Sequence, residues 1–261
     1  YCPFAELDQN IGYLDTSFAL KNVDSIASAT IGTAFMLNDE IMVYESYDSD
    51  TKIITVKRGA LDTVPHLHST DDNLFFYDQY PSYSTTQYVV SEVIDAKVLT
   101  TTPSGIQGVG DATALPVEFD ARMIRPYPPA NVKINDEYYP IEIETDLVVT
   151  WVDRNRVQQT GGSILGWTDG GVTIESGTST MLTIKELDVD DLVVATHNID
   201  ATGTNTYTLA ISAMQADTKS IEVTAKTVRD GYDSYQFFQH TVVLSIFFSA
   251  PYDIEYTLRE V

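Results

Sequence analysis

Residues 147–159 limit the possible fold more than any other stretch of the chain. The first half, LVVTWV, alternates with a period of two, which is typical of a β-strand with one buried face. Leu147, Val149 and Trp151 share one face, which we expect to pack in a core. The second half, DRNRVQQ, is polar and places Arg154 and Arg156 two residues apart. The stretch predicts a core strand that ends in an arginine-bearing edge, and it contains no catalytic motif.

Similar β signals recur along the whole chain, whereas no strong helix is predicted. Short β-branched or aromatic segments are separated by Gly, Asn, Asp and Pro, which are typical turn residues. We therefore predict an all-β protein, with a small N-terminal β domain followed by an immunoglobulin-like β-sandwich. Besides 147–152, strands are expected at 34–37, 41–44, 52–57, 74–77, 88–90, 93–99, 132–134, 180–184, 192–196, 207–211, 221–228 and 241–248.

A proline-rich segment marks the main domain boundary. RPYPPA at 125–130 has three prolines in four residues, which favours stiff, extended backbone. The predicted domains are residues 1–80, a small β domain, and residues 126–248, the sandwich. Residues 81–125 form a connector with a long Gly- and Thr-rich loop at 100–113, and residues 249–261 form a final strand or tail.

Charge and cysteine content exclude several classes of function. The net charge is −23, from 38 acidic residues against 15 Lys and Arg, so neither nucleic acid nor an anionic membrane is an expected partner. Such acidity favours solubility or, alternatively, cation binding at acidic loops. The single cysteine, Cys2, allows no internal disulfide and no thiolate metal cluster. We find no signal peptide and no apolar run near the ~18 residues of a membrane span, and the start at Tyr1 suggests a processed or partial chain.

Candidate ligand residues are few. His66 and His68 lie two residues apart in the segment 58–68, where Asp62 could complete a zinc site; hydrogen bonding within an ordered loop is the alternative. Asp48 with Asp50 could bind calcium or form a solvated turn, and the same choice holds for residues 188, 190 and 191. The sequence therefore identifies no catalytic, cofactor-binding or metal-binding residue, and we expect a protein that is not an enzyme and has no cofactor.

Arginines and aromatic residues are the better candidates for contacts. Arg154, Arg156 and Arg229 could form bidentate pairs with carboxylates, either inside the sandwich or between subunits. Aromatic residues between 232 and 238 suit an interface. Possible aromatic platforms for a sugar are Tyr80, Tyr83, Trp167 and Tyr232.

Several motifs in one order resemble the C-terminal region of tail-tip hub proteins of tailed phages and gene transfer agents. The first set is DEIM at 39–42, TVKRGALDT at 55–63 and His68. The second set is RPYPPAN at 125–131, TWVDRNR at 150–156 with Gln158 and Gln159, and RDGYDSYQ at 229–236. Together they cover most of residues 36–245. The resemblance implies a fibronectin type III-like module in the second half and supplies no catalytic residues.

The resemblance implies a structural virion protein of a phage tail tip or baseplate, assembled in the host cytoplasm. Its partners would be other tail or baseplate proteins, it would be a homotrimer, and it could touch a receptor or glycan on the host surface. The alternative function is a carbohydrate-binding or cell-surface adhesin module. A hydrolase with two converging carboxylates is the third hypothesis.

Overall fold

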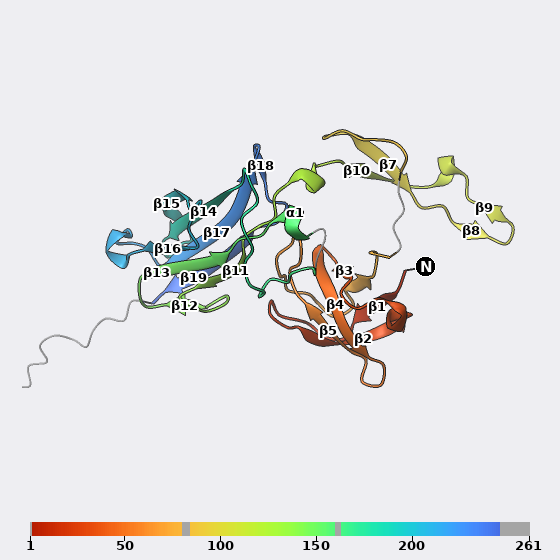
Figure 1. Cartoon of the computed structure of the whole chain (residues 1–261), viewed down its shortest axis with the longest axis horizontal. Helices are drawn as coiled ribbons and strands as arrows, with labels where there is room; N and C mark the ends of the chain where they lie inside the picture. Colours follow the sequence, from red (N-terminus) through yellow and green to blue (C-terminus); the bar gives the residue numbers. More distant parts are fainter. Residues whose placement is uncertain (1, 80–83, 160–162, 246–261) are drawn as a thin grey trace, which may run out of the picture.

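A computed structural model describes residues 2–79, 84–159 and 163–245. It contains two β bodies, a barrel and a sandwich, and a connector that carries a projecting two-stranded arm (Figure 1). The predicted fold class is confirmed, since strands dominate the described residues and the one α-helix among them has four residues. The predicted tail at 249–261, and the last residues of the strand expected at 241–248, lie outside the described residues.

The N-terminal body is a closed six-stranded barrel with the strand order β1-β2-β5-β4-β3-β6. Its core is filled by large apolar side chains that include Phe18, Phe35, Met42 and Ile54, all fully buried. The strands are β1 (Phe4–Leu7), β2 (Ser17–Asp24), β3 (Ala34–Leu37), β4 (Glu40–Asp48), β5 (Ile53–Lys57) and β6 (Asn73–Phe75), with a 3₁₀ turn η1 (Ile26–Ser28).

Two barrel strands, β1 and β2, have no counterpart in the sequence prediction, because their segments lack a clean alternation of apolar and polar residues. The β3–β4 hairpin is tighter than predicted. Only Asn38 and Asp39 form the turn, with Asn38 at φ 50°, a conformation that Asn tolerates well. Glu40, which falls between the expected strands 34–37 and 41–44, is therefore the first residue of β4 and is fully buried.

The connector forms the arm. Strands β7 (Val93–Lys97) and β10 (Ala114–Glu118) pair antiparallel, and a small hairpin, β8 (Thr101–Thr102) with β9 (Gly105–Ile106), continues beyond them. The 3₁₀ turn η2 (Val109–Asp111) lies between β9 and β10, and the 3₁₀ turn η3 (Arg122–Ile124) follows β10. The prediction of one long loop at 100–113 was thus too coarse, because Gly105 at φ 148° allows a hairpin turn there. The strand predicted at 88–90 is wrong: Tyr88 lies outside any strand and stacks on Phe119 at 4.5 Å.

The C-terminal body is a two-layer sandwich with a shared core. One layer has the order β11-β13-β16 and the other β12-β19-β17-β14-β15, with β18 paired to β17. This strand order is that of a fibronectin III-like sandwich. The strands are β11 (Ala130–Ile134), β12 (Glu142–Ile143), β13 (Leu147–Val152), β14 (Ser179–Leu187), β15 (Val193–Asp200), β16 (Thr206–Leu209), β17 (Ser220–Arg229), β18 (Tyr232–Asp233) and β19 (Phe238–Leu244), with a 3₁₀ turn η4 (Ile211–Ala213).

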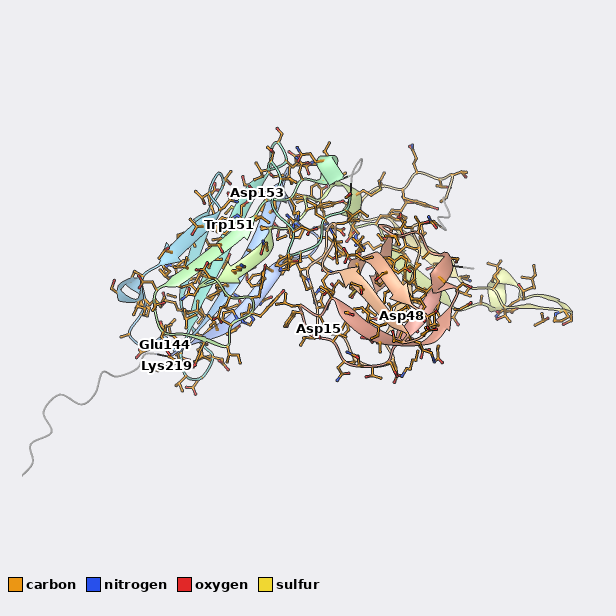
Figure 2. All side chains as sticks on the ribbon, turned by 60° about the horizontal axis from the view of Figure 1, so that its bottom comes forward. Asp15, Asp48, Glu144, Trp151, Asp153 and Lys219 are labelled. Atoms are coloured by element: carbon orange, nitrogen blue, oxygen red, sulfur yellow. The ribbon has the colours of Figure 1, made fainter. Side chains whose placement is uncertain are left out.

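Strand β13 has the alternation that the sequence predicts. Leu147, Val149 and Trp151 are buried in the core between the layers, and Figure 2 labels Trp151 within the sandwich. The predicted arginine-bearing strand edge is wrong, because the strand ends at Val152 and helix α1 (Arg156–Gln159) follows. The side chain of Asn155 ends the strand by capping the helix: its Oδ1 accepts hydrogen bonds from the backbone N–H groups of residues 157 and 158 at 3.0 and 3.2 Å.

Candidate functional site

A buried cluster of charged residues lies in the barrel. The Arg58 guanidinium donates two hydrogen bonds to the Glu40 carboxylate, at 2.7 and 2.8 Å, and His68 Nε2 lies 2.8 Å from the same carboxylate. All three side chains are almost fully buried. Burial alone would raise the pKa of Glu40, but the hydrogen bonds from Arg58 and His68 outweigh it and hold that pKa below its ordinary value. Glu40 is therefore an anion at neutral pH.

This cluster shapes the following loop, residues 58–68, which we name the Arg-Gly loop. Gly59 has φ 52°, and a Cβ there would lie 2.6 Å from Pro65 Cδ, so only glycine fits. Thr63 Oγ1 accepts a hydrogen bond from the Ile41 N–H at 3.1 Å and donates one to the Ala60 carbonyl at 2.8 Å. The loop is thus ordered by its own polar side chains and by strand β4.

The Arg-Gly loop accounts for the predicted histidine pair. His68 contacts Glu40, whereas His66 Nε2 lies 3.2 Å from Gln236 Oε1 in the sandwich. Asp62, the suggested third ligand, is held by Arg122 instead, at 2.6 and 2.9 Å. Within the described residues, no group of three or more His, Cys, Asp or Glu side chains is arranged to hold a metal ion. His66, His68 and Asp62 each bind a different partner, as expected for side chains that form hydrogen bonds within an ordered loop.

The same loop joins the barrel to the sandwich, and Gln236 is central to this joint. Its Oε1 accepts a hydrogen bond from the Val64 N–H at 2.9 Å, and its Nε2 donates one to the Asp39 carbonyl at 2.7 Å. The Val64 side chain packs into the sandwich core. Beside it, the rings of Tyr13 and Tyr139 stack at 4.0 Å across the joint. Barrel and sandwich are therefore joined by both polar and apolar contacts.

A second loop of the sandwich completes the joint. The backbone N–H of Trp167 donates a hydrogen bond to the Arg58 carbonyl at 2.7 Å. Lys57 Nζ forms an ion pair with Asp169 Oδ2 at 2.9 Å. A Cβ on Gly166 would lie 2.7 Å from the Lys57 Cβ, so glycine permits this close approach. The motif residues 57–59 thus sit directly against the loop 166–170.

Arg154 holds that loop in place. Its buried guanidinium donates hydrogen bonds to the carbonyls of Gly166 at 2.7 Å and Gly170 at 3.0 Å. Burial lowers the pKa of Arg154 to about 10, and the nearby Asp169 partly counters that shift. The predicted bidentate pair between Arg154 and a carboxylate is therefore wrong, because the guanidinium donates to backbone carbonyls of this loop instead.

The other arginines tie the connector to the sandwich. Arg156 and Arg229 both pair with Glu175, and Arg156 Nη2 lies 3.1 Å from its Oε1. Arg156 also donates to the carbonyl of Met123, and Arg229 donates to that of Ile124 at 2.9 Å. The ion pairs of Arg156 and Arg229 thus lie inside the sandwich, as one of the two predicted alternatives requires, and their remaining donors reach the connector.

The predicted aromatic interface between residues 232 and 238 lies partly within the chain itself. Arg122 stacks over the ring of Tyr235 at 4.2 Å, and Phe238 is buried in the sandwich core. Trp167 is only 1% exposed, so it cannot be an open platform for a sugar. Tyr232 is partly exposed, with the Arg125 guanidinium 5.9 Å from its ring. Tyr80 and Tyr83 lie outside the described residues.

The acidic segments at residues 48–50 and 188–191 form turns in which a carboxylate bonds the local backbone, as expected for solvated turns. Asp48 Oδ1 accepts a hydrogen bond from the Asp50 N–H at 2.8 Å, and Figure 2 places Asp48 on the barrel. Asp188 Oδ1 accepts hydrogen bonds from the N–H groups of Asp190 and Leu192, both at 2.9 Å. A short side chain that bonds its own backbone is a common turn device.

Two surface features remain without a role inside the chain. The first is a largely apolar groove of about 600 Å³ where barrel, connector and helix α1 meet. We name it the connector groove; its lining includes Met36, Ile41, Leu61, Tyr77, Met123 and Tyr127. The second is the arm, whose large apolar side chains are mostly exposed. The sequence predicts neither feature, because the sequence alone does not distinguish an apolar residue on the surface from one in the core.

The comparisons with known proteins leave the function open. No family model matches the chain, and no curated protein matches it. Among solved structures, the chain is similar to the crystal structure of the chicken CNTN1 FN1–FN3 domains, with 10% identity over 94% of this chain and 67% of that chain. The TM-score of 0.27 is too low for any argument. Among the described residues, no helix is long and apolar enough to cross a membrane. The fold therefore rests on the strand order, and the function is a proposal.

Proposed function

We propose that this chain is a structural component of a phage tail tip or baseplate. It acts as a rigid β unit that holds neighbouring tail proteins and contacts the host surface. In this role it is a homotrimer in the virion, and it is assembled in the host cytoplasm without a cofactor or a reaction. Its partners are other tail or baseplate proteins.

The observation that carries the proposal is where the motif residues of the tail-hub resemblance lie. Arg58, Gly59 and His68, from the first motif set, build the Arg-Gly loop. Gln236 and Arg154, from the second set, hold that loop and its neighbour across the joint. The two sets are far apart in sequence yet meet at one interface. Motif residues that fix two β modules in one orientation suit a protein whose task is to hold a shape.

Electron microscopy of particles tests the proposal. Antibodies against the sandwich, carrying gold, are applied to purified particles from the host that produces this chain, and mass spectrometry checks that the chain is present in them. We expect label at the end of the tail, with threefold symmetry in an averaged map. Absence of the chain from purified particles, or label on the capsid instead, contradicts the proposal.

A second candidate function is glycan binding at the host surface. A cleft of about 380 Å³ at the joint is lined by Tyr13, Phe237, His66 and Gln239, which combines aromatic faces with polar groups. Phe237 is 41% exposed and available for stacking on a sugar. A glycan array with the intact chain tests this, and hits that vanish with Phe237→Ala but persist with Val243→Ala, another exposed residue of the sandwich, support it. An array without hits removes this candidate.

A further inference from the structure

The arm is amphipathic across its two faces. Strands β7 and β10 pair with Ile94 opposite Val117 and Ala96 opposite Leu115, so these side chains project from the same side. That side carries only apolar residues. The other side carries Asp95, Lys97 and Glu118 together with apolar neighbours. One face of the arm is therefore built like the inner face of a sandwich sheet, which normally packs against a second layer.

No second layer covers this face within the described residues. Leu115 is 57% exposed and Val117 is 44% exposed, although both sit in regular strands. A two-stranded ribbon is marginally stable by itself in water, and it needs a covered apolar face to persist. Figure 1 shows the arm leading away from helix α1 and the sandwich.

The connector groove offers the missing apolar surface, and each chain has one. It lies at the root of the arm, where Met123 is 88% exposed at its rim. Burial raises the pKa of Tyr77 and of Tyr127 to about 12, so both phenol groups in the groove are neutral. The apolar part of the groove lining suits the apolar face of a β-ribbon.

Charge favours a contact between the arm and this groove. The arm, residues 93–118, carries three acidic side chains, Asp95, Asp111 and Glu118, against Lys97 alone. Around the groove the balance is reversed. Its lining includes Arg122 and Arg156 against Asp62 as the one acidic side chain. In a chain of net charge −23, this lining complements an acidic arm.

We propose that the arm of one copy packs its apolar face into the connector groove of another copy of this chain. Because each chain has one arm and one groove, the contact is heterologous, and under the threefold symmetry of the proposed homotrimer it forms a closed ring. The inference deepens the proposed function and rests on it for the expectation that copies assemble. It names the two surfaces through which they do so.

Cross-linking between two different variants tests the contact. Both full-length chains carry Cys2→Ser; one also carries Val117→Cys on the apolar face, and the other carries Met123→Cys at the groove rim. We expect a covalent dimer when the two are mixed under mild oxidation, and little of it from either alone. Val93→Cys, on the opposite face of the same arm, is the matched control and should cross-link poorly to Met123→Cys.

Each other outcome overturns the proposal. Cross-linking of Val117→Cys only with itself means that two arms pair with each other. No cross-link in the mixture, with a monomer in sedimentation at every soluble concentration, means that this chain does not use the arm for self-association.

A binding measurement gives the size of the effect. Leu115→Asp with Val117→Asp should raise the dissociation constant between copies by about 100-fold or more, because buried anchors of this kind dominate interfaces. Val93→Asp should change it little. All three residues are exposed, so the folded body is preserved. Particle labelling and these solution measurements are independent, so a monomeric chain found at the tail tip refutes the arm contact without refuting the structural role.

Discussion

The joint between barrel and sandwich differs from the arm in almost every physical respect. At the joint, the buried Glu40 carboxylate is paired with Arg58, and side chains such as Val64 cross from one body into the core of the other. Along the arm, residues 93–118 include a single buried hydrophobic side chain, Ala112. The body can therefore hold its shape unaided, whereas the arm has surface to gain from a partner. The joined barrel and sandwich thus form a rigid platform, whereas the arm is the element that we propose serves in assembly.

The largest expected effect comes from breaking the buried cluster. Arg58→Ala should lower the free energy of unfolding by about 3–5 kcal/mol, because it leaves the buried Glu40 carboxylate without its partner. Denaturant unfolding followed by tryptophan fluorescence measures this change. Lys21→Ala is the control; it removes an ion pair with Asp71 at the barrel surface and should leave stability unchanged. Equal effects of the two variants would show that the cluster is not what makes the body rigid.

A smaller effect should follow from cutting the joint alone. Gln236→Ala removes the hydrogen bonds to Val64 and Asp39 and should cost about 1–3 kcal/mol. It should also separate the unfolding of barrel and sandwich, which we expect to be one transition in the unchanged chain. Calorimetry detects this separation. Gln239→Ala, three residues further on in β19 and bonded to Glu222 within the sandwich, should lower stability without splitting the transition. A split in both variants contradicts the role of Gln236.

The sequence predicts local features where one period dominates, as at β13, where Leu147, Val149 and Trp151 alternate and all three are buried. It fails where a single side chain overrides the local pattern. Asn155 ends that strand by capping α1, and the turn before Glu40 is shorter than predicted because the Glu40 carboxylate is anchored to Arg58 and His68, which follow it in sequence by 18 and 28 positions.

The candidate site could be predicted only in part, for a related reason. The sequence shows that Arg58 and Gly59 begin an ordered loop, but the partners that fix it, such as Gln236, are about 170 residues away. Spacing within a motif carries no information on such pairs. The two faces of the arm are equally hidden, because the register of β7 against β10 decides which side chains share a face.

Acid should weaken the barrel and its joint to the sandwich. Glu40 and Asp169 both have a pKa below the ordinary value in the folded state; burial opposes this, and hydrogen bonds from Arg58 and Lys57, respectively, outweigh burial. Carboxylates of this kind stabilise the fold above their unfolded pKa, and that stability is lost as the pH falls through the folded pKa. The free energy of unfolding should therefore fall below pH 4.5, the ordinary value for glutamate.

Thermal melts over a pH series measure this decline. Glu40→Gln should lower stability at neutral pH and flatten the decline in acid, since one of the responsible groups no longer titrates. An unchanged slope in Glu40→Gln would assign the acid sensitivity to other carboxylates, such as Glu186, whose pKa is also lowered against the effect of burial by bonds from Thr218 and His197.

The smallest expected effect on stability comes from removing the arm. Replacing residues 93–118 by a short Gly-Ser linker should change the free energy of unfolding of the body by less than about 1 kcal/mol, because a segment with so few buried contacts adds little to the global fold. The Arg122–Asp62 pair stays in place at the root. Calorimetry compares this variant with the unchanged chain under conditions where both are monomeric. A large loss of stability would mean that the arm belongs to the rigid platform, and the contrast between the two regions would then be false.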